Sequence, residues 1–123
     1  MRPAPPLKQG SIWWLNDCPP LEGDRAKDRP VVVVSPNQIL KAGGALVVVA
    51  CSSTVLESDK TRIELPNLAD TPQTKTGLDR PTWVVPRWFL AVERERLRDY
   101  IGHLTGTLLK RVVASVEAEI LGK

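Results

Sequence analysis

Short apolar runs, separated by polar or proline-containing segments, occupy most of the chain before residue 105. The four valines from Val31 to Val34 and the stretch from Ala45 to Cys51 are too short for helices and rich in β-branched residues, so they predict buried strands. Segments in which apolar and polar residues alternate predict half-buried strands. The strands expected are 10–16, 31–35, 45–51, 61–65, 82–85 with an apolar continuation over 89–92, and 99–104.

The last part of the chain has a different period. Between Thr105 and Leu121 apolar residues recur at three- and four-residue steps, which predicts an amphipathic helix with Thr105 as its N-cap and Gly122 as its stop. Single helical turns are expected at 37–42 and 93–98. Short strands followed by one helix predict a mostly β fold with some α, a small and strongly bent sheet closed by the C-terminal helix.

Residues outside these elements divide into an arm and two loops. Residues 1–9 contain three prolines and are expected to form a flexible arm in front of a single domain over 10–123. The polar segment 17–28 is expected to be a loop, and loops of about a dozen residues are often functional. A second loop is expected at 66–75.

Composition narrows the classes of function. The longest apolar stretches are far below the roughly 18 residues that cross a bilayer, and the N-terminus has no secretory apolar segment, which favours the cytoplasm. Cys18 and Cys51 are therefore expected to be reduced and partly buried. With His103 as the single histidine, no metal-ligand spacing exists, so we expect neither a metal nor another cofactor. The net charge of +3 permits a polyanionic partner without requiring one.

Five motifs occur in a recognisable order. GSIWWL at 10–15 is followed by two prolines and then by DRPVVVVS at 28–35. GALVVVACSS at 44–53, GLD at 77–79 and LRDYIGHL at 97–104 come next. In this order the motifs resemble those of the PemK/MazF toxins, and the resemblance extends from about residue 10 to the C-terminus.

The resemblance implies both a fold and an activity. The fold would be an SH3-like β-barrel that forms a homodimer. The activity would be that of a type II toxin-antitoxin toxin, an endoribonuclease that cleaves single-stranded messenger RNA without a metal. Its products would carry a 2′,3′-cyclic phosphate and a 5′-hydroxyl, and a cognate antitoxin protein would be a partner.

The resemblance also assigns residues. The family's catalytic arginine falls on Arg29, its catalytic Thr or Ser on Ser52 with Ser53 adjacent, and the acidic residue of its first loop on Asp24. A guanidinium suits the negative charge that builds on phosphoryl oxygens when a ribose 2′-hydroxyl attacks phosphorus, and a hydroxyl donates a hydrogen bond to the same group. The plainer alternatives are a loop ion pair for Arg29 and an end-of-strand hydrogen bond for Ser52. Candidate RNA-binding residues are Arg25, Lys27, Arg87 and Trp14, the last by stacking on a base.

Departures from the family pattern leave open whether this chain catalyses RNA cleavage. Many members carry an acidic or amide residue and a second arginine where this chain reads PRWFL at 86–90, with Leu90 in the arginine position. Ser11 replaces the usual acid of the opening motif. Arg87 is a candidate replacement for the missing charge, and His103 occupies a position that is not usually catalytic. The alternatives are a non-catalytic barrel that binds RNA or protein and, with less support, a gyrase poison.

Overall fold

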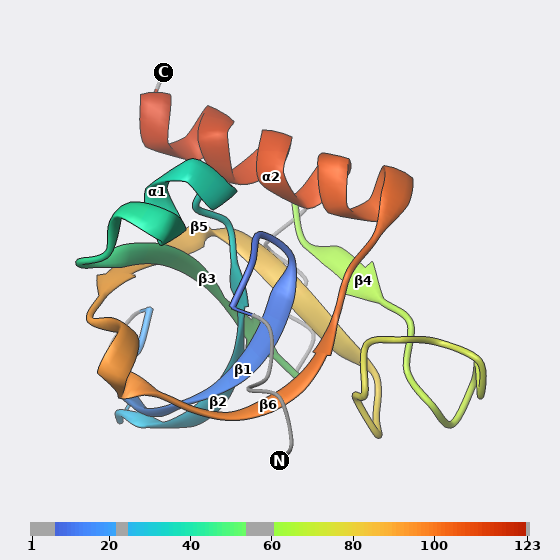
Figure 1. Ribbon diagram of the computed structural model, residues 1–123. Coiled ribbons are helices and arrows are strands. Elements are labelled where there is room, and N and C mark those ends of the chain that lie inside the picture. The colour runs from blue at the N-terminus through green and yellow to red at the C-terminus, as the bar shows by residue number, and fades with distance from the viewer. Residues whose placement is uncertain (1–6, 22–24, 54–60, 123) are drawn as a thin grey trace, which may run out of the picture.

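The computed structural model describes residues 7–21, 25–53 and 61–122. Over these ranges the chain forms strands, two α-helices and one 3-10 turn (Figure 1). The strands are β1 (Ser11–Cys18), β2 (Lys27–Val33), β3 (Leu46–Ser52), β4 (Ile63–Leu65), β5 (Thr82–Val92) and β6 (Leu97–His103), the helices are α1 (Asn37–Ala42) and α2 (Gly106–Leu121), and the 3-10 turn covers Arg94–Arg96.

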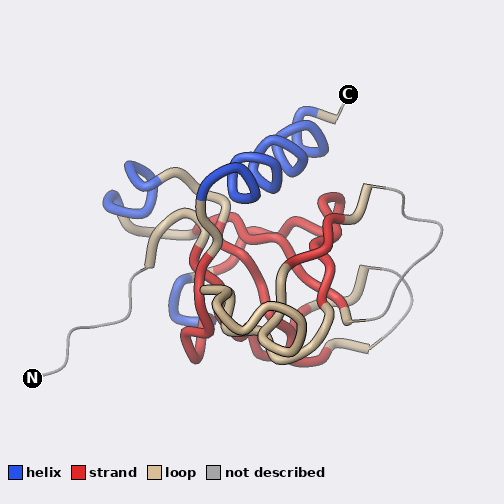
Figure 2. Tube along the Cα trace, turned by 90° about the vertical axis from the view of Figure 1, so that its right-hand side faces the viewer, coloured by secondary structure: helices blue, strands red, loops and turns tan. Residues whose placement is uncertain are grey.

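All strands belong to one antiparallel sheet with the order β4-β5-β3-β2-β1-β6. The sheet curls strongly, and α2 lies across one of its faces (Figures 1 and 2). The predicted architecture, a small bent sheet closed by a C-terminal helix, is therefore confirmed. Within the described residues, no helix is long and apolar enough to span a bilayer.

The valine runs of β2 and β3 are apolar at every position because they separate two cores. Val32 belongs to the core that also contains Val112 and Val116 of α2. Val31 and Val33 belong to a second core, on the concave side, which includes Leu40 of α1. Successive side chains of a strand point to opposite faces, so a sheet covered on both faces needs apolar residues at every position.

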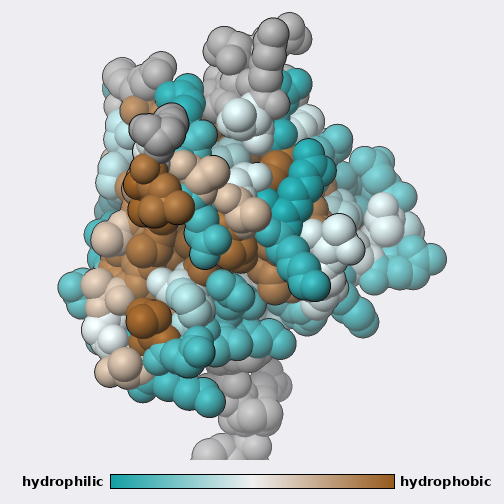
Figure 3. All heavy atoms as spheres, turned by 90° about the horizontal axis from the view of Figure 1, so that it is seen from above, coloured by the Kyte–Doolittle hydropathy of each residue, from teal (hydrophilic) through white to brown (hydrophobic). Residues whose placement is uncertain are grey.

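The terminal helix follows its predicted pattern with one difference at its start. Its apolar stripe is buried at Val112 and Val116, while Ile120 and Leu121 near its end are 47% and 83% exposed. Figure 3 shows apolar side chains gathered toward the left, where Figure 1 places α1 and the C-terminal end of α2. Thr105 stands at the N-cap position but its side chain makes no capping hydrogen bond. Gly122 ends the helix in the left-handed conformation, as predicted.

Several predicted boundaries were wrong, and strand pairing explains two of them. Residues at both ends of the expected loop 17–28 are in strands, because β1 reaches Cys18 and pairs there with Lys27 after a register shift beyond Leu15. Asp17 takes a positive φ of 53° at this shift. The second error concerns β5, which runs through Pro86 without a break. The register between β3 and β5 shifts beside this proline, so no ladder hydrogen bond is required from it.

The expected N-terminal arm falls mostly outside the described residues, since residues 1–6 are not among them. Leu7 packs against the concave core. The backbone N–H of Gln9 donates a hydrogen bond to Asn37 Oδ1 at 2.9 Å. The chain is thus in contact with the barrel from Leu7 onward.

Candidate functional site

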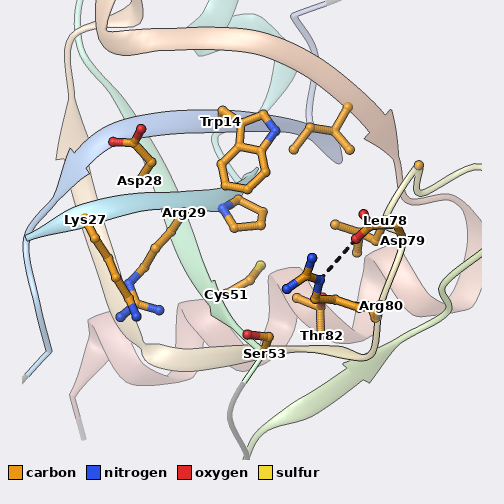
Figure 4. A pocket seen from close by; sticks show the side chains of 13 residues that line it. Trp14, Lys27, Asp28, Arg29, Cys51, Ser53, Leu78, Asp79, Arg80 and Thr82 are labelled. Atoms are coloured by element: carbon orange, nitrogen blue, oxygen red, sulfur yellow. Dashed lines mark hydrogen bonds and ion pairs between the residues drawn. The ribbon is translucent and has the colours of Figure 1, made fainter.

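A pocket of about 400 Å³ lies at the end of the sheet where β1, β2 and β3 face the segment before β5 (Figure 4). Its apolar lining includes Pro30, Cys51 and Ile101 from the sheet and Leu78 from the segment before β5. Trp14 projects into it from β1 and is 39% exposed. Trp13, the next residue, packs instead on the concave core and on Tyr100, with ring centroids 5.5 Å apart.

Charged side chains give the pocket a net positive lining. Three cations, Lys27, Arg29 and Arg80, line it together with two carboxylates, Asp28 and Asp79. In Figure 4, Lys27 and Arg29 lie at one end and Arg80 at the other. The arrangement is complementary to a polyanion rather than to a single small anion, because the positive groups are spread along the pocket.

Arg29 is held by an aromatic ring. Its guanidinium carbon Cζ lies 4.6 Å from the centroid of the Trp88 ring, a distance at which a cation is attracted to the ring face. Trp88 is only 5% exposed, and its indole Nε1 donates a hydrogen bond to the Pro19 carbonyl at 3.0 Å. Arg29 is therefore fixed against a ring that is itself anchored to the exit of β1.

One donor of Arg29 is buried without a partner. Its Nε has no hydrogen bond within the described part of the chain. An unpaired buried donor costs about 1–3 kcal/mol. Such groups usually indicate a catalytic role or a place for water or an ion. The Nε donor of Arg29 is thus available to a water molecule or to an anion.

Two hydroxyl groups lie at the end of β3, which pairs with the strand that carries Arg29. In the β2–β3 pairing Val31 faces Ala50, and continuing this register by two residues sets Arg29 opposite Ser52, with both side chains on the concave face. Ser52 is buried, whereas Ser53 is exposed and lines the pocket. Arg29 and Ser53 therefore line the same pocket, whereas Ser52 does not line it and lies at the end of the neighbouring strand.

The cysteines contribute no charge to this site. Burial raises the pKa of Cys18, and Arg29 and Arg96 oppose that rise. Burial raises the pKa of Cys51 to about 12, with a further rise from Cys18 and a small opposing effect from Arg29. Both thiols are free and buried, as predicted. Because the nucleophilic form of cysteine is the thiolate, neither thiol is a nucleophile at neutral pH.

The remaining candidates from the sequence lie in different places. Lys27 and Trp14 line the pocket. Arg25 and Arg87 are exposed, do not line it, and each makes an interaction within the protein. Asp24 lies outside the described residues. His103, also outside the pocket lining, has its Nδ1 2.9 Å from the Tyr100 hydroxyl.

Ser11, which replaces the usual acid of the opening motif, has a structural role. Its hydroxyl donates a hydrogen bond to the Lys8 carbonyl at 2.7 Å and accepts one from Trp13 Nε1 at 2.9 Å. The side chain is fully buried. It joins the start of β1 to the preceding turn and does not reach the pocket lining.

Sequence reasoning missed Trp88, Asp79 and Arg80 as site residues. Asp79 was part of a recognised motif, and Arg80 follows it directly. Trp88 stood in the stretch where the family carries an acidic or amide residue, but nothing in the sequence placed its ring on Arg29.

Comparison with known proteins identifies the family of the chain. Residues 8–120 match the family described as PemK-like, MazF-like toxins of type II toxin-antitoxin systems. This chain belongs to that toxin family. The resemblance expected from the sequence is confirmed, although no curated protein sequence matches the chain.

Solved structures of MazF-type toxins have the same fold. MazF from Deinococcus radiodurans has a TM-score of 0.68 at 18% identity, with 96% of this chain and 97% of that chain covered. An endoribonuclease from a mycobacterial species, crystallised with its cognate antitoxin, has a TM-score of 0.67 at 17% identity, covering 97% and 98%. The Mycobacterium tuberculosis toxin MazF-mt6 has a TM-score of 0.64 at 17% identity, covering 90% and 95%. At these identities the likeness establishes the MazF-like fold.

Proposed function

We propose that this toxin is a sequence-selective endoribonuclease that cleaves single-stranded RNA without a metal ion. The observation that carries the proposal is the position of Arg29, held on the Trp88 ring across from Ser52 at a positively lined pocket. Family membership supplies the context, because structures of the same fold include proteins described as endoribonucleases.

The reaction is an internal transfer at phosphorus. The ribose 2′-oxygen forms a bond to phosphorus and loses its proton to water, while the bond to the 5′-oxygen breaks and that oxygen takes a proton from water. The products are a 2′,3′-cyclic phosphate and a 5′-hydroxyl. Arg29 stabilises the charge on the non-bridging oxygens, a contribution of about 3–4 kcal/mol for a well-placed donor. Ser52 donates a hydrogen bond to one of those oxygens, and Ser53 and Asp24 position the substrate.

Partners and location follow from the same proposal. Lys27, Arg25 and Arg87 attract the phosphate backbone, and Trp14 contacts a base. A cognate antitoxin controls the toxin in the cytoplasm, by analogy with the mycobacterial endoribonuclease crystallised with its own antitoxin. The active form is a homodimer, for which light scattering should give about twice the chain mass of 13.6 kDa. A monomer at high protein concentration would contradict the dimer.

Incubation with a long single-stranded RNA in EDTA tests the activity. We expect fragments with 5′-hydroxyl and cyclic phosphate ends, and a rate lower by about 100- to 1,000-fold in Arg29→Ala. Arg111→Ala on the exposed face of α2 is the matched control and should cut like the unchanged protein. Intact RNA from a folded sample, or unchanged cutting by Arg29→Ala, would reject the proposal. RNA retention without new ends would instead favour a binding module, and inhibited supercoiling a gyrase poison.

A further inference from the structure

We propose that the pocket selects one unpaired RNA nucleotide, whose base stacks on Trp14, donates hydrogen bonds to Asp79 and carries a phosphate bound by Arg80. This inference rests on the proposed endoribonuclease function, since it names what the same pocket recognises. Asp79 and Arg80 are given no role by the family motifs described above. Three independent features of the pocket support the assignment.

The first feature is an exposed aromatic face inside a pocket. Because β1 side chains alternate, Trp13 is taken up by the concave core and Tyr100, and Trp14 is left on the other side. Trp14 points into the pocket above Cys51 (Figure 4), and Pro30 also lines the pocket. Unpaired bases are commonly bound by stacking on such rings, and stacking tolerates any base. Trp14 therefore contributes affinity for RNA but does not discriminate between bases.

The second feature is a rigid wall opposite that ring. Gly77 has a φ of 71°, and a Cβ at this position would overlap the Ile101 carbonyl oxygen of β6. Leu78 is buried, and its carbonyl accepts a hydrogen bond from the Leu68 amide at 2.7 Å. On the far side, the Thr82 hydroxyl donates to the Arg80 carbonyl at 3.0 Å. Asp79 and Arg80 thus project from a backbone fixed at both ends, which lowers the ordering cost of binding.

The third feature is the chemistry of the two side chains on that wall. Arg80 Nε and Asp79 Oδ1 are 3.3 Å apart, with the side chains 69% and 78% exposed. Such exposed pairs are worth little, so both groups can turn to a ligand at small cost. An ionised carboxylate only accepts hydrogen bonds, and it therefore favours bases with an exocyclic amino group over uracil. The guanidinium matches a phosphate.

The spacing of the charges fits a chain of nucleotides. Arg80 lies at the opposite end of the pocket from Lys27 and Arg29, with Trp14 between them (Figure 4). In single-stranded RNA, each base is flanked by a phosphate on either side. A base on Trp14 would direct one phosphate toward Arg29, where cleavage is proposed, and the other toward Arg80. The selected base is therefore adjacent to the scissile bond.

Binding of 2′-fluoro RNA tests the subsite apart from cleavage, because this RNA lacks the attacking hydroxyl. Fluorescence anisotropy at low salt should show binding about 5- to 150-fold weaker for Trp14→Leu, with most affinity retained by Trp14→Phe. The matched control is Phe89→Leu, which removes a ring of similar exposure, 37%, on β5 outside the pocket. It should bind like the unchanged protein.

Two further variants separate base choice from phosphate binding. Asp79→Asn should remove a preference of about 5-fold or more for an amino-bearing base at one position of the RNA. Arg80→Gln should weaken binding to all sequences alike and lower the salt slope by about one. Asp99→Asn and Arg111→Gln, both at exposed positions outside the pocket, are the controls.

The results of these experiments separate the nucleotide subsite from the endoribonuclease activity on which it depends. If the unchanged protein cleaves RNA but Asp79→Asn keeps the same base preference, the subsite is wrong and the endoribonuclease remains. Unchanged affinity in folded Trp14→Leu has the same meaning. If the unchanged protein neither binds nor cleaves RNA at low salt, both proposals fail.

Discussion

Replacing Trp88 tests whether the indole ring holds Arg29 in its working position. The two side chains meet at 4.6 Å from Cζ to the ring centroid, in a place where Trp88 is almost fully buried. Trp88→Leu removes the ring and its attraction for the cation. Trp88→Phe keeps an aromatic face but loses the indole hydrogen bond to Pro19.

The size of the effect follows from the burial of the contact. A cation–π interaction that is shielded from water is worth about 2 kcal/mol. If that energy holds the guanidinium in one orientation, its loss lowers the productive fraction by about 30-fold. Single-turnover cleavage in EDTA should therefore slow by about that factor in Trp88→Leu, with KM changed much less. Trp88→Phe should lose less than about 5-fold, because most of the ring face remains.

A cavity in the core is the main competing explanation. Trp88→Leu removes part of a buried side chain and should itself destabilise the fold by about 2–4 kcal/mol. Val33→Ala is the matched control, since it opens a cavity in the same concave core, four residues along β2 from Arg29. Its rate, corrected for the folded fraction, should equal that of the unchanged protein.

A direct readout of the contact completes the test. In the unchanged protein the side-chain protons of Arg29 should be shifted upfield in NMR spectra by the ring current of Trp88, and Trp88→Leu should remove the shift. The reasoning is refuted if folded Trp88→Leu cleaves at the original rate. It is also refuted if the loss is the same in Val33→Ala, because the cavity would then explain it.

Three further predictions concern stability and the second catalytic group. Since burial raises the pKa of Cys51 to about 12, the folded chain keeps a proton that the unfolded chain loses above about pH 8.5, so this thiol should lower stability toward pH 12 by about 1.4 kcal/mol per pH unit. Burial raises the pKa of Cys18 as well, so urea melts of Cys51→Val should show a shallower fall with pH than those of the unchanged protein. Gly77→Ala should lower the free energy of unfolding more than Gly44→Ala, measured in the same way, because both have positive φ but only Gly77 has a backbone carbonyl in the way. Ser52→Ala should slow cleavage about 10-fold through the loss of one hydrogen bond to the phosphoryl group, and a smaller effect than in Ser53→Ala would assign the role to Ser53.

Much of the fold could be predicted because burial imposes a simple pattern on the sequence. A strand covered on both faces must be apolar at each step, so the valine runs of β2 and β3 indicated strands in the middle of the sheet. A helix covered on one face must repeat at three and four residues, as α2 does. The predicted boundaries were wrong where pairing with a neighbouring strand overrode the preference of the local sequence. Pro86 is tolerated within β5 because β3 shifts register beside it, and β1 extends to Cys18 because Lys27 pairs with it.

Less of the candidate site could be predicted from the sequence, because the site consists of contacts between segments that are far apart in the chain. Arg29 and Ser52 were named through the motif order, and the β2–β3 register brings them together. The ring on Arg29 comes from a strand nearly sixty positions later in the chain, and the Asp79–Arg80 wall depends on the packing of Gly77 against β6. Neither contact has a local pattern from which it could be inferred.

The departure of this chain from the family pattern has a physical reading that is compatible with activity. A side-chain amide that held the arginine would do so by accepting a hydrogen bond and would occupy one of its donors. An aromatic ring attracts the face of the guanidinium and leaves the N–H groups, which lie in its plane, available to a phosphate. Trp88 thus changes how Arg29 is held without reducing its charge or blocking its donors. Leu90, at the position of the family's second arginine, packs against the concave core and does not line the pocket, whereas Arg80 supplies a cation to the pocket from the other wall. Arg80→Gln should therefore impair RNA binding more than Arg87→Gln does, since Arg80 lines the pocket and Arg87 does not.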